Sequence, residues 1–207
     1  MKILFVLQSI GFGGSMTSMI NLLTLLKKDE KTLDIDVLLM DPYGELYHEL
    51  EKNVHILKTD YALQAVTLSR EKIISKKMYR LLFRRALMWT KGKICRNSTS
   101  HQGYLLSAKY YSNKYDCVIA YQESIATDYA KYIKAPKHIA WVHNDYDNVL
   151  KRYHDCNDMR NTYDYYDKIV CVSKAGAQNF INKSGLNTDK ITCIYNTLIT
   201  EKLNQKS

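Results

Sequence analysis

The sequence predicts an α/β protein built on one open, parallel β-sheet. Three observations indicate this class. Short apolar runs alternate with segments of helical apolar period along most of the 207 residues. The chain opens on a strand, a glycine turn and a helix, and its composition, 46% apolar and 25% charged, is that of a globular domain. No internal repeat or linker interrupts the series, so we expect a single domain over 1–207, with about seven strands and helices on both faces of the sheet.

The first unit sets the direction of the sheet. A strand at 3–7 is followed by Gly11-Phe12-Gly13-Gly14-Ser15 and by a periodic helix at 16–26. A helix N-terminus next to a glycine turn offers free N–H groups to whatever binds beyond the strand. Six further strands are expected, at 34–40, 54–57, 115–120, 137–142, 167–172 and 191–194.

Further helices connect these strands, as right-handed crossovers of a parallel sheet require. They are expected at 45–52, 124–133, 148–166 and 174–183. Ser173 ends the sixth strand and is expected to cap the helix that begins at 174. The polar stretch 95–102 is predicted to be a mobile loop.

The segment 70–94 is a basic amphipathic helix by pattern, and two interpretations of it stand. Its apolar positions repeat with helical period at Ile74, Met78, Leu81, Leu82, Ala86 and Trp89, and no acid lies between 72 and 93. The helix either covers the sheet with a solvated polar face or meets anionic lipid headgroups. In the second case the docking residues are Lys77, Arg80, Arg84 and Lys91.

Composition restricts the partners. The formal charge of +9 indicates a phosphate-bearing partner, but no nucleic-acid-binding motif accompanies it, so nucleic acid ranks below lipid and phosphorylated ligands. No transmembrane run or signal peptide is recognisable, which predicts a cytoplasmic protein. The five cysteines form no close pair and are expected to be reduced, with no metal bound.

Candidate site residues follow the strands, because ligands of open parallel sheets bind outside the carboxyl ends of the strands. His143 directly follows the fifth strand, and Asp145 is placed to orient its ring while the other ring nitrogen bonds a substrate hydroxyl. Glu123 either accepts hydrogen bonds from sugar hydroxyls or stabilises a helix start. Ser173 and Asn196 follow the sixth and seventh strands.

The glycine turn matches only part of the dinucleotide-binding pattern G-x-G-x-x-G. Its third glycine position is Met16, and Asp34 and Asp36 precede the apolar run of the second strand instead of closing it. A nicotinamide oxidoreductase is therefore disfavoured. The turn remains a general site for an anionic or hydroxyl-rich ligand.

With these residues in place, the chain resembles the N-terminal half of a bacterial family 4 glycosyltransferase, one Rossmann-like half of a GT-B fold. Besides the strand leading to Gly13-Gly14, four stretches carry the likeness in the family's order. They are YDCVIAY at 115–121, KHIAWVHNDY at 137–146, YDKIVCVS at 166–173 and KITCIYN at 190–196. The stretch around His143 looks most like enzymes that build capsular or other surface polysaccharides.

The resemblance implies a two-domain enzyme that moves a sugar from a nucleotide donor to an acceptor with retention at the anomeric carbon. The matches imply that His143 contacts the transferred sugar, that Gly13, Gly14 and Ser15 lie against the donor phosphate and the acceptor, and that Ser173 and Asn196 line the cleft. The acceptor would be a saccharide or a lipid-linked saccharide, at the inner face of the cell membrane. No metal or cofactor is expected, since the nucleotide sugar is a substrate.

Two departures from the family pattern matter. Some members place an acid directly after the histidine, whereas here Asn144 intervenes before Asp145. The family's donor-binding pair of glutamates, separated by seven residues, has no match. We therefore expect an N-terminal domain without its donor-binding domain, inactive alone. The alternative is a stand-alone module that binds a glycan or lipid carrier and works with a separate donor-domain chain.

Overall fold

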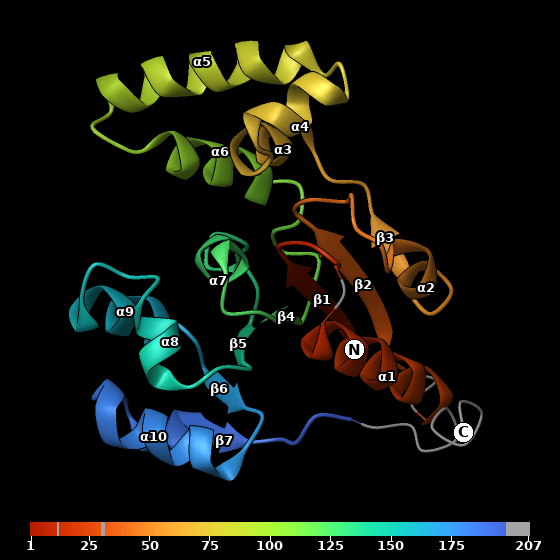
Figure 1. The fold of residues 1–207 in the computed structure, drawn as a ribbon, viewed down its shortest axis with the longest axis vertical. Helices are drawn as coiled ribbons and strands as arrows, with labels where there is room; N and C mark the ends of the chain where they lie inside the picture. Colours follow the sequence, from red (N-terminus) through yellow and green to blue (C-terminus); the bar gives the residue numbers. More distant parts are fainter. Residues whose placement is uncertain (12, 30–31, 198–207) are drawn as a thin grey trace.

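In the computed structural model, which describes residues 1–11, 13–29 and 32–197, the predicted seven strands form one parallel sheet. Their spatial order is β3-β2-β1-β4-β5-β6-β7 (Figure 1). The strands are β1 (Lys2–Leu7), β2 (Asp34–Leu39), β3 (His55–Leu57), β4 (Cys117–Ala120), β5 (Lys137–Val142), β6 (Lys168–Cys171) and β7 (Ile191–Cys193). The α/β class, the parallel sheet and the strand positions are thus confirmed.

The sheet changes direction of growth between β1 and β4. The chain first adds β2 and β3 on one side of β1, then returns to add β4 on its other side, where Phe5 pairs with Val37 and Ile119. In sheets of this kind the crevice at the change of direction is where ligands bind. The crevice here lies between the loops that follow β1 and β4.

Helices cover both faces of the sheet, as the sequence predicts. Side chains of β1 alternate between two cores: Leu4 and Val6 join one, and Phe5 and Leu7 join the other. The second core is closed by α1 (Gly14–Asp29) and α2 (Tyr47–Glu51). The first includes residues of α3 (Tyr61–Thr67), α6 (Thr99–Ala108), α7 (Ile125–Ala130), α8 (Tyr146–Leu150), α9 (Cys156–Tyr163) and α10 (Lys174–Ser184).

The predicted single helix over 70–94 is wrong, because the chain turns at Lys77. Helix α4 (Arg70–Ser75) ends two residues before Lys77, whose backbone is in the left-handed region at φ 55°. Helix α5 (Tyr79–Ile94) then starts in a new direction. The turn lets Ile73 and Leu81 enter the same small core beside α3. Helix α5 packs on α3, α4 and α6 and lies outermost, beyond them from the sheet (Figure 1).

Three further helices differ from the sequence expectations at the residues that cap them. The stretch 95–102 is not a loop throughout, since Ser98 accepts a hydrogen bond from the His101 N–H and starts α6 at Thr99. The segment 148–166 is divided into α8 and α9, with Asp155 capping the second. Helix α3 was not expected at all and is capped by Asp60. Each of the three helices begins at a polar residue whose side chain accepts hydrogen bonds from backbone N–H groups of the first turn.

Several local details complete the fold. A short 3₁₀ turn at Thr188–Lys190 precedes β7. Cys117 and Cys171 are buried, and all five cysteines are free. No helix in the described part of the chain is long and apolar enough to cross a bilayer. Phe12 of the glycine turn, and the end of the chain from residue 198, lie outside the described residues.

Candidate functional site

A polar cleft of about 510 Å³ opens at the carboxyl edge of the sheet, at the change of direction between β1 and β4. Four separate parts of the chain form it: the loops after β1, β4 and β5, and the segment after β7. The start of α1 completes one wall. The residues that line it are Gln8, Ser9, Gly14, Ser15, Gln122, Glu123, Ser124, His143, Asn144 and Asn196.

The start of α1 brings Gly14 and Ser15 to the cleft, as the sequence predicts, while Gly13 precedes them. A methyl group placed on Gly13 or on Gly14 would meet no other described atom within 4 Å. Gly14 does not have a positive φ. The described part of the fold therefore does not require glycine at position 14, and the open space in front of the helix N-terminus suits an anionic group.

The His143 ring is held by the chain's backbone. Its Nε2 lies 3.0 Å from the Tyr121 carbonyl oxygen, and because a carbonyl only accepts, Nε2 carries the proton. The ring also packs 4.9 Å from that of Tyr121. Nδ1 is buried and has no hydrogen-bond partner among the described residues. A neutral His143, which lines the cleft, thus keeps a buried acceptor without a partner among the described residues.

Burial sets the charge of this ring. It lowers the pKa of His143, and this effect exceeds the opposing influence of the Glu123 carboxylate and of the hydrogen bond to Tyr121. The neutral form of His143 therefore persists to a lower pH than that of an ordinary histidine. A neutral ring can accept a hydrogen bond from a hydroxyl group but does not attract phosphate by charge.

Glu123 ties two loops of the cleft together. One carboxylate oxygen accepts a hydrogen bond from the His143 backbone N–H at 3.0 Å, and the other accepts one from the Asn144 side chain. The contacts of Glu123 thus place the loop after β5 against the loop after β4. This positions the His143 ring, a function that neither sequence interpretation of Glu123 included.

Asp145 has a different place from the one the sequence suggested. Its carboxylate accepts a hydrogen bond from the Asn148 N–H at 2.9 Å and caps α8, and the hydrogen bond of the His143 ring goes to Tyr121. Asp145 and Ser173 line a smaller adjoining cavity of about 230 Å³. Ser173 caps α10 through the Gly176 N–H at 3.0 Å, which confirms the predicted cap.

Asn196 reaches the cleft because the chain crosses from β7 to α1. Its side-chain oxygen accepts a hydrogen bond of 2.9 Å from the Ser18 hydroxyl, and the Thr197 carbonyl accepts one from Asn21. Ser18 also lies 3.4 Å from the Tyr121 hydroxyl. This segment closes the side of the cleft next to α1.

The sequence analysis overlooked the first residues after β1. Gln8 and Ser9 line the cleft, and the Gln8 N–H donates to the Gln122 side chain at 3.2 Å. The signal was present, since both directly follow a buried strand. Among described residues, no group of three or more His, Cys, Asp or Glu is placed to hold a metal ion.

The proposed docking residues lie apart from the cleft. Lys77 forms the turn before α5, and Arg80, Arg84 and Lys91 lie on that helix. The last three line a cavity of about 610 Å³ between α3, α5 and α6, and a second of about 670 Å³ lies on the other flank of α5. These two cavities are larger than the cleft but lack its polar side chains from several strand ends.

The fold resembles one half of solved GT-B glycosyltransferases. Apo WaaB, a lipopolysaccharide outer core galactosyltransferase, aligns with a TM-score of 0.61 and 16% identity, over 96% of this chain and 46% of WaaB. Anabaena HepE in complex with UDP aligns with a TM-score of 0.55 and 17% identity, over 100% of this chain and 50% of HepE. No protein-family model and no curated protein sequence matches. The chain therefore has the Rossmann-like fold of a GT-B half and spans about half the length of these structures.

Proposed function

We propose that this chain is the acceptor-side domain of a retaining family 4 glycosyltransferase that builds surface polysaccharide. The observation that carries the proposal is His143, which lines the polar cleft and whose buried Nδ1 has no hydrogen-bond partner among the described residues. A buried acceptor without a partner is unfavourable unless a ligand satisfies it. A sugar hydroxyl supplies the missing donor.

The start of α1 supports a second part of the ligand. Gly13 and Gly14 leave space that no other described residue fills, in front of the N–H groups of a sixteen-residue helix. A diphosphate fits both the space and the partial positive charge. A nucleoside diphosphate sugar has this group next to a hydroxyl-rich ring. HepE, one of the similar structures, is in complex with UDP.

The proposed reaction joins the acceptor oxygen to the anomeric carbon of the donor sugar. The bond between that carbon and the diphosphate oxygen breaks, the nucleoside diphosphate leaves, and the acceptor's hydroxyl proton passes to the departing phosphate or to solvent. His143 holds the transferred sugar through a hydrogen bond to Nδ1, and Glu123 positions His143. The chain spans about half of the similar structures, so we infer that turnover requires a second half that binds the nucleotide.

The test is transfer by a protein that contains both halves, with His143→Ala compared with His154→Ala, which lies on an exposed loop outside the cleft. We expect His143→Ala to lower kcat/KM about a hundred-fold, as removal of one well-placed active-site hydrogen-bonding group does. His154→Ala should leave it unchanged. Near-normal transfer by His143→Ala would remove this residue from the site, and turnover by the purified 207-residue chain would contradict the need for a second half.

A further inference from the structure

The outer side of α5 carries a row of exposed apolar side chains, called here the α5 ridge: Tyr79, Phe83, Leu87 and Ile94. Spacings of four, four and seven residues place them on one side of a helix. Their exposed fractions are 58%, 69%, 53% and 82%. Large apolar side chains gathered on one exposed face are typical of an interaction surface.

The ridge has no part in the core. The opposite side of α5 supplies the packing, through Leu81, Met88 and Gly92, which are buried. Helix α5 would therefore fold onto α3 and α6 with polar residues in place of the ridge. The apolar outer face needs an explanation other than folding.

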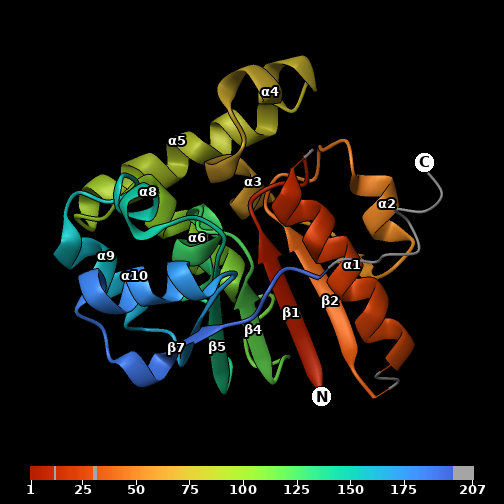
Figure 2. The same ribbon diagram turned by 60° about the horizontal axis from the view of Figure 1, so that its bottom comes forward.

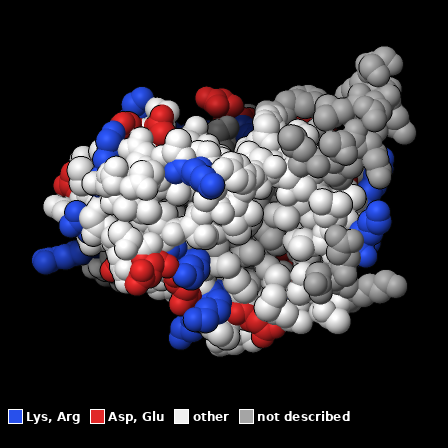
Figure 3. All heavy atoms as spheres, turned by 90° about the horizontal axis from the view of Figure 1, so that it is seen from below, with Lys and Arg blue, Asp and Glu red and all other residues white. Residues whose placement is uncertain are grey.

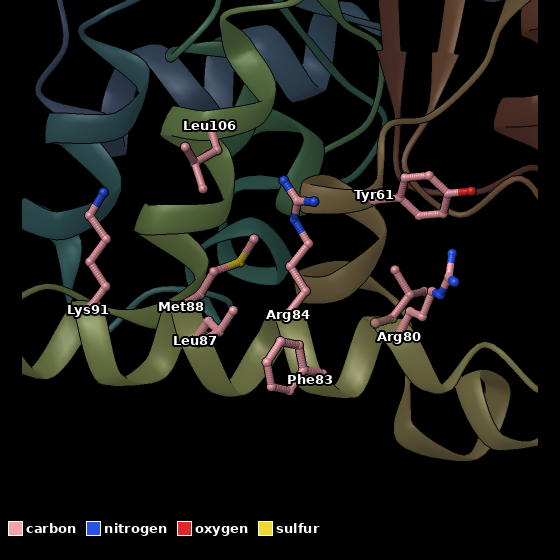
Figure 4. A pocket seen from close by; sticks show the side chains of 9 residues that line it. Tyr61, Arg80, Phe83, Arg84, Leu87, Met88, Lys91 and Leu106 are labelled. Atoms are coloured by element: carbon pink, nitrogen blue, oxygen red, sulfur yellow. The ribbon is translucent and has the colours of Figure 1, made fainter.

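A row of cations borders the ridge. Arg80, Arg84 and Lys91 extend from α5 toward the side where α3 and α6 lie (Figure 4). These three side chains line the 610 Å³ cavity together with Phe83 and Leu87 of the ridge, and Met88 and Leu106 complete its lining. This arrangement, an apolar strip with basic side chains along its edge, is the pattern of helices that lie in a membrane interface.

The charge of the whole protein is concentrated in this region. Between positions 72 and 114 the sequence has eleven Lys and Arg and no Asp or Glu, so the rest of the chain has more acidic than basic residues. The face that carries α10 and β7 shows residues of both signs together at its borders (Figure 3). The excess of +9 therefore belongs to the α4–α6 region.

The ridge lies at the same end of the molecule as the cleft. Helices α4 and α5 lie beyond the carboxyl end of β1, opposite the end where the chain starts (Figure 2). Two residues of the loop after β2 contact the α4 region. Asp41 forms an ion pair with Lys72, and the centre of the Tyr43 ring lies 4.9 Å from the Lys76 ammonium nitrogen. The loop after β2 also touches the loop after β1. A methyl group placed on Gly44 of the first loop would lie 1.9 Å from the carbonyl oxygen of Ile10 in the second.

We propose that the α5 ridge and its basic border dock on the surface of an anionic lipid bilayer. The apolar side chains enter the interface, and Arg80, Arg84 and Lys91 meet the lipid phosphates. A second copy of the chain fits less well, because it would bring two strongly basic regions together. Nucleic acid would use the charge but leave Leu87 and Ile94 without a role. A bilayer uses both features.

Docking of this kind does not depend on the reaction proposed above. One consequence rests on the proposed function: a surface at the carboxyl edge would hold the cleft near an acceptor that is anchored in the membrane by a lipid. Vesicle binding and glycosyl transfer are separate measurements, so either proposal can fail alone.

The experiment is co-sedimentation of the chain with vesicles of phosphatidylcholine alone and of phosphatidylcholine with an equal part of phosphatidylglycerol. We expect at least about ten-fold stronger partition into the anionic vesicles, weakened by added salt, because each basic side chain near such a surface contributes about five-fold. The fluorescence of Trp89, which is half exposed on the flank of α5, should shift to shorter wavelength on binding.

Two variants separate the contributions. Phe83→Ser with Leu87→Ser keeps every charge, and Arg80→Gln with Arg84→Gln and Lys91→Gln keeps the ridge. Each should lower partition into anionic vesicles at least about ten-fold. The matched control is Lys27→Gln with Lys28→Gln and Lys134→Gln, which removes three exposed cations outside α5. This control should change partition into anionic vesicles by less than about three-fold.

Three results would overturn the proposal. They are equal sedimentation with the two vesicle types, no sedimentation with either, and unchanged anionic binding by the two ridge and border variants while their circular dichroism matches the parent chain. Sedimentation velocity without vesicles tests the alternative that the ridge binds a second copy of the chain. A dimer that Phe83→Ser with Leu87→Ser dissociates, together with absent vesicle binding, would assign the ridge to a second copy.

Discussion

The cleft and the α5 ridge lie at the same end of the molecule but are assembled in opposite ways. Cleft residues come from positions as far apart as Gln8 and Asn196 and meet only because parallel strands end at one edge. The ridge comes from one continuous helix of sixteen residues. A site of the first kind depends on the whole fold, whereas a surface of the second kind depends on the orientation of a single element.

The two regions also differ in how their side chains are satisfied. In the cleft, Glu123 and Tyr121 bind His143 and leave one ring nitrogen unpaired. On the ridge, Phe83 and Ile94 are mostly exposed, at 69% and 82%. We therefore propose that the cleft selects a ligand by hydrogen bonding and that the ridge selects a surface by area and charge. Three predictions test this contrast, in order of decreasing expected effect.

The largest effect compares two neighbours on α5. Leu81→Ala removes a side chain that is 1% exposed in the small core with Ile73, and should lower the free energy of unfolding by about 3 kcal/mol. Phe83→Ala removes an exposed ring and should change it by less than about 0.5 kcal/mol. Urea unfolding followed by circular dichroism measures both. A large loss of stability from Phe83→Ala would mean that the ridge belongs to the core after all.

A smaller effect is expected at the start of α1. Gly14→Ala should leave stability equal or raise it by about 0.5–1 kcal/mol, because alanine suits a helix better and its methyl group meets no other described atom. The same methyl group would fill the space proposed for phosphate. UDP binding by a protein with both halves, measured by calorimetry, should weaken about ten-fold, or about 1.4 kcal/mol. Unchanged binding would show that no ligand approaches this backbone.

The smallest effect concerns pH. Burial lowers the pKa of His143 in the folded chain, whereas in the unfolded chain it titrates near 6.5. The unfolded state therefore takes up this proton first, so the stability that depends on neutral His143 is present above about pH 6.5 and is lost as the pH falls below it. His143→Gln should reduce this loss between about pH 6.5 and 5, whereas His154→Gln should keep it. The same slope in both variants would assign the pH dependence to other groups.

The sequence located the strands and the places where they end, because buried strands leave apolar runs that can be read locally. That was enough to bring His143, Glu123 and Asn196 into one candidate site, and the structure gathers all three in the cleft. It did not show what each side chain contacts. Asp145 was placed beside the His143 ring by its spacing, yet a polar residue two positions after a strand also starts the next helix, and Asp145 caps α8.

The outer layer was predicted less well. Apolar period suggested one helix over 70–94 with Ile74 and Trp89 on its inner side. The turn at Lys77 redirects α5, and both of these side chains are more than half exposed. Periodicity describes a face relative to a straight axis, and it cannot indicate where that axis bends or which side meets a neighbour.

The sequence by itself determined the α/β class, the parallel sheet, the glycine turn and the concentration of positive charge between β3 and β4. These follow from local preferences and from the apolar content of each segment. Tertiary structure alone decided that His143 keeps one ring nitrogen free, that Glu123 binds the loop holding it, and that α5 turns its apolar row outward. Such features depend on contacts between residues far apart in the chain, and no local pattern encodes the partner of a side chain.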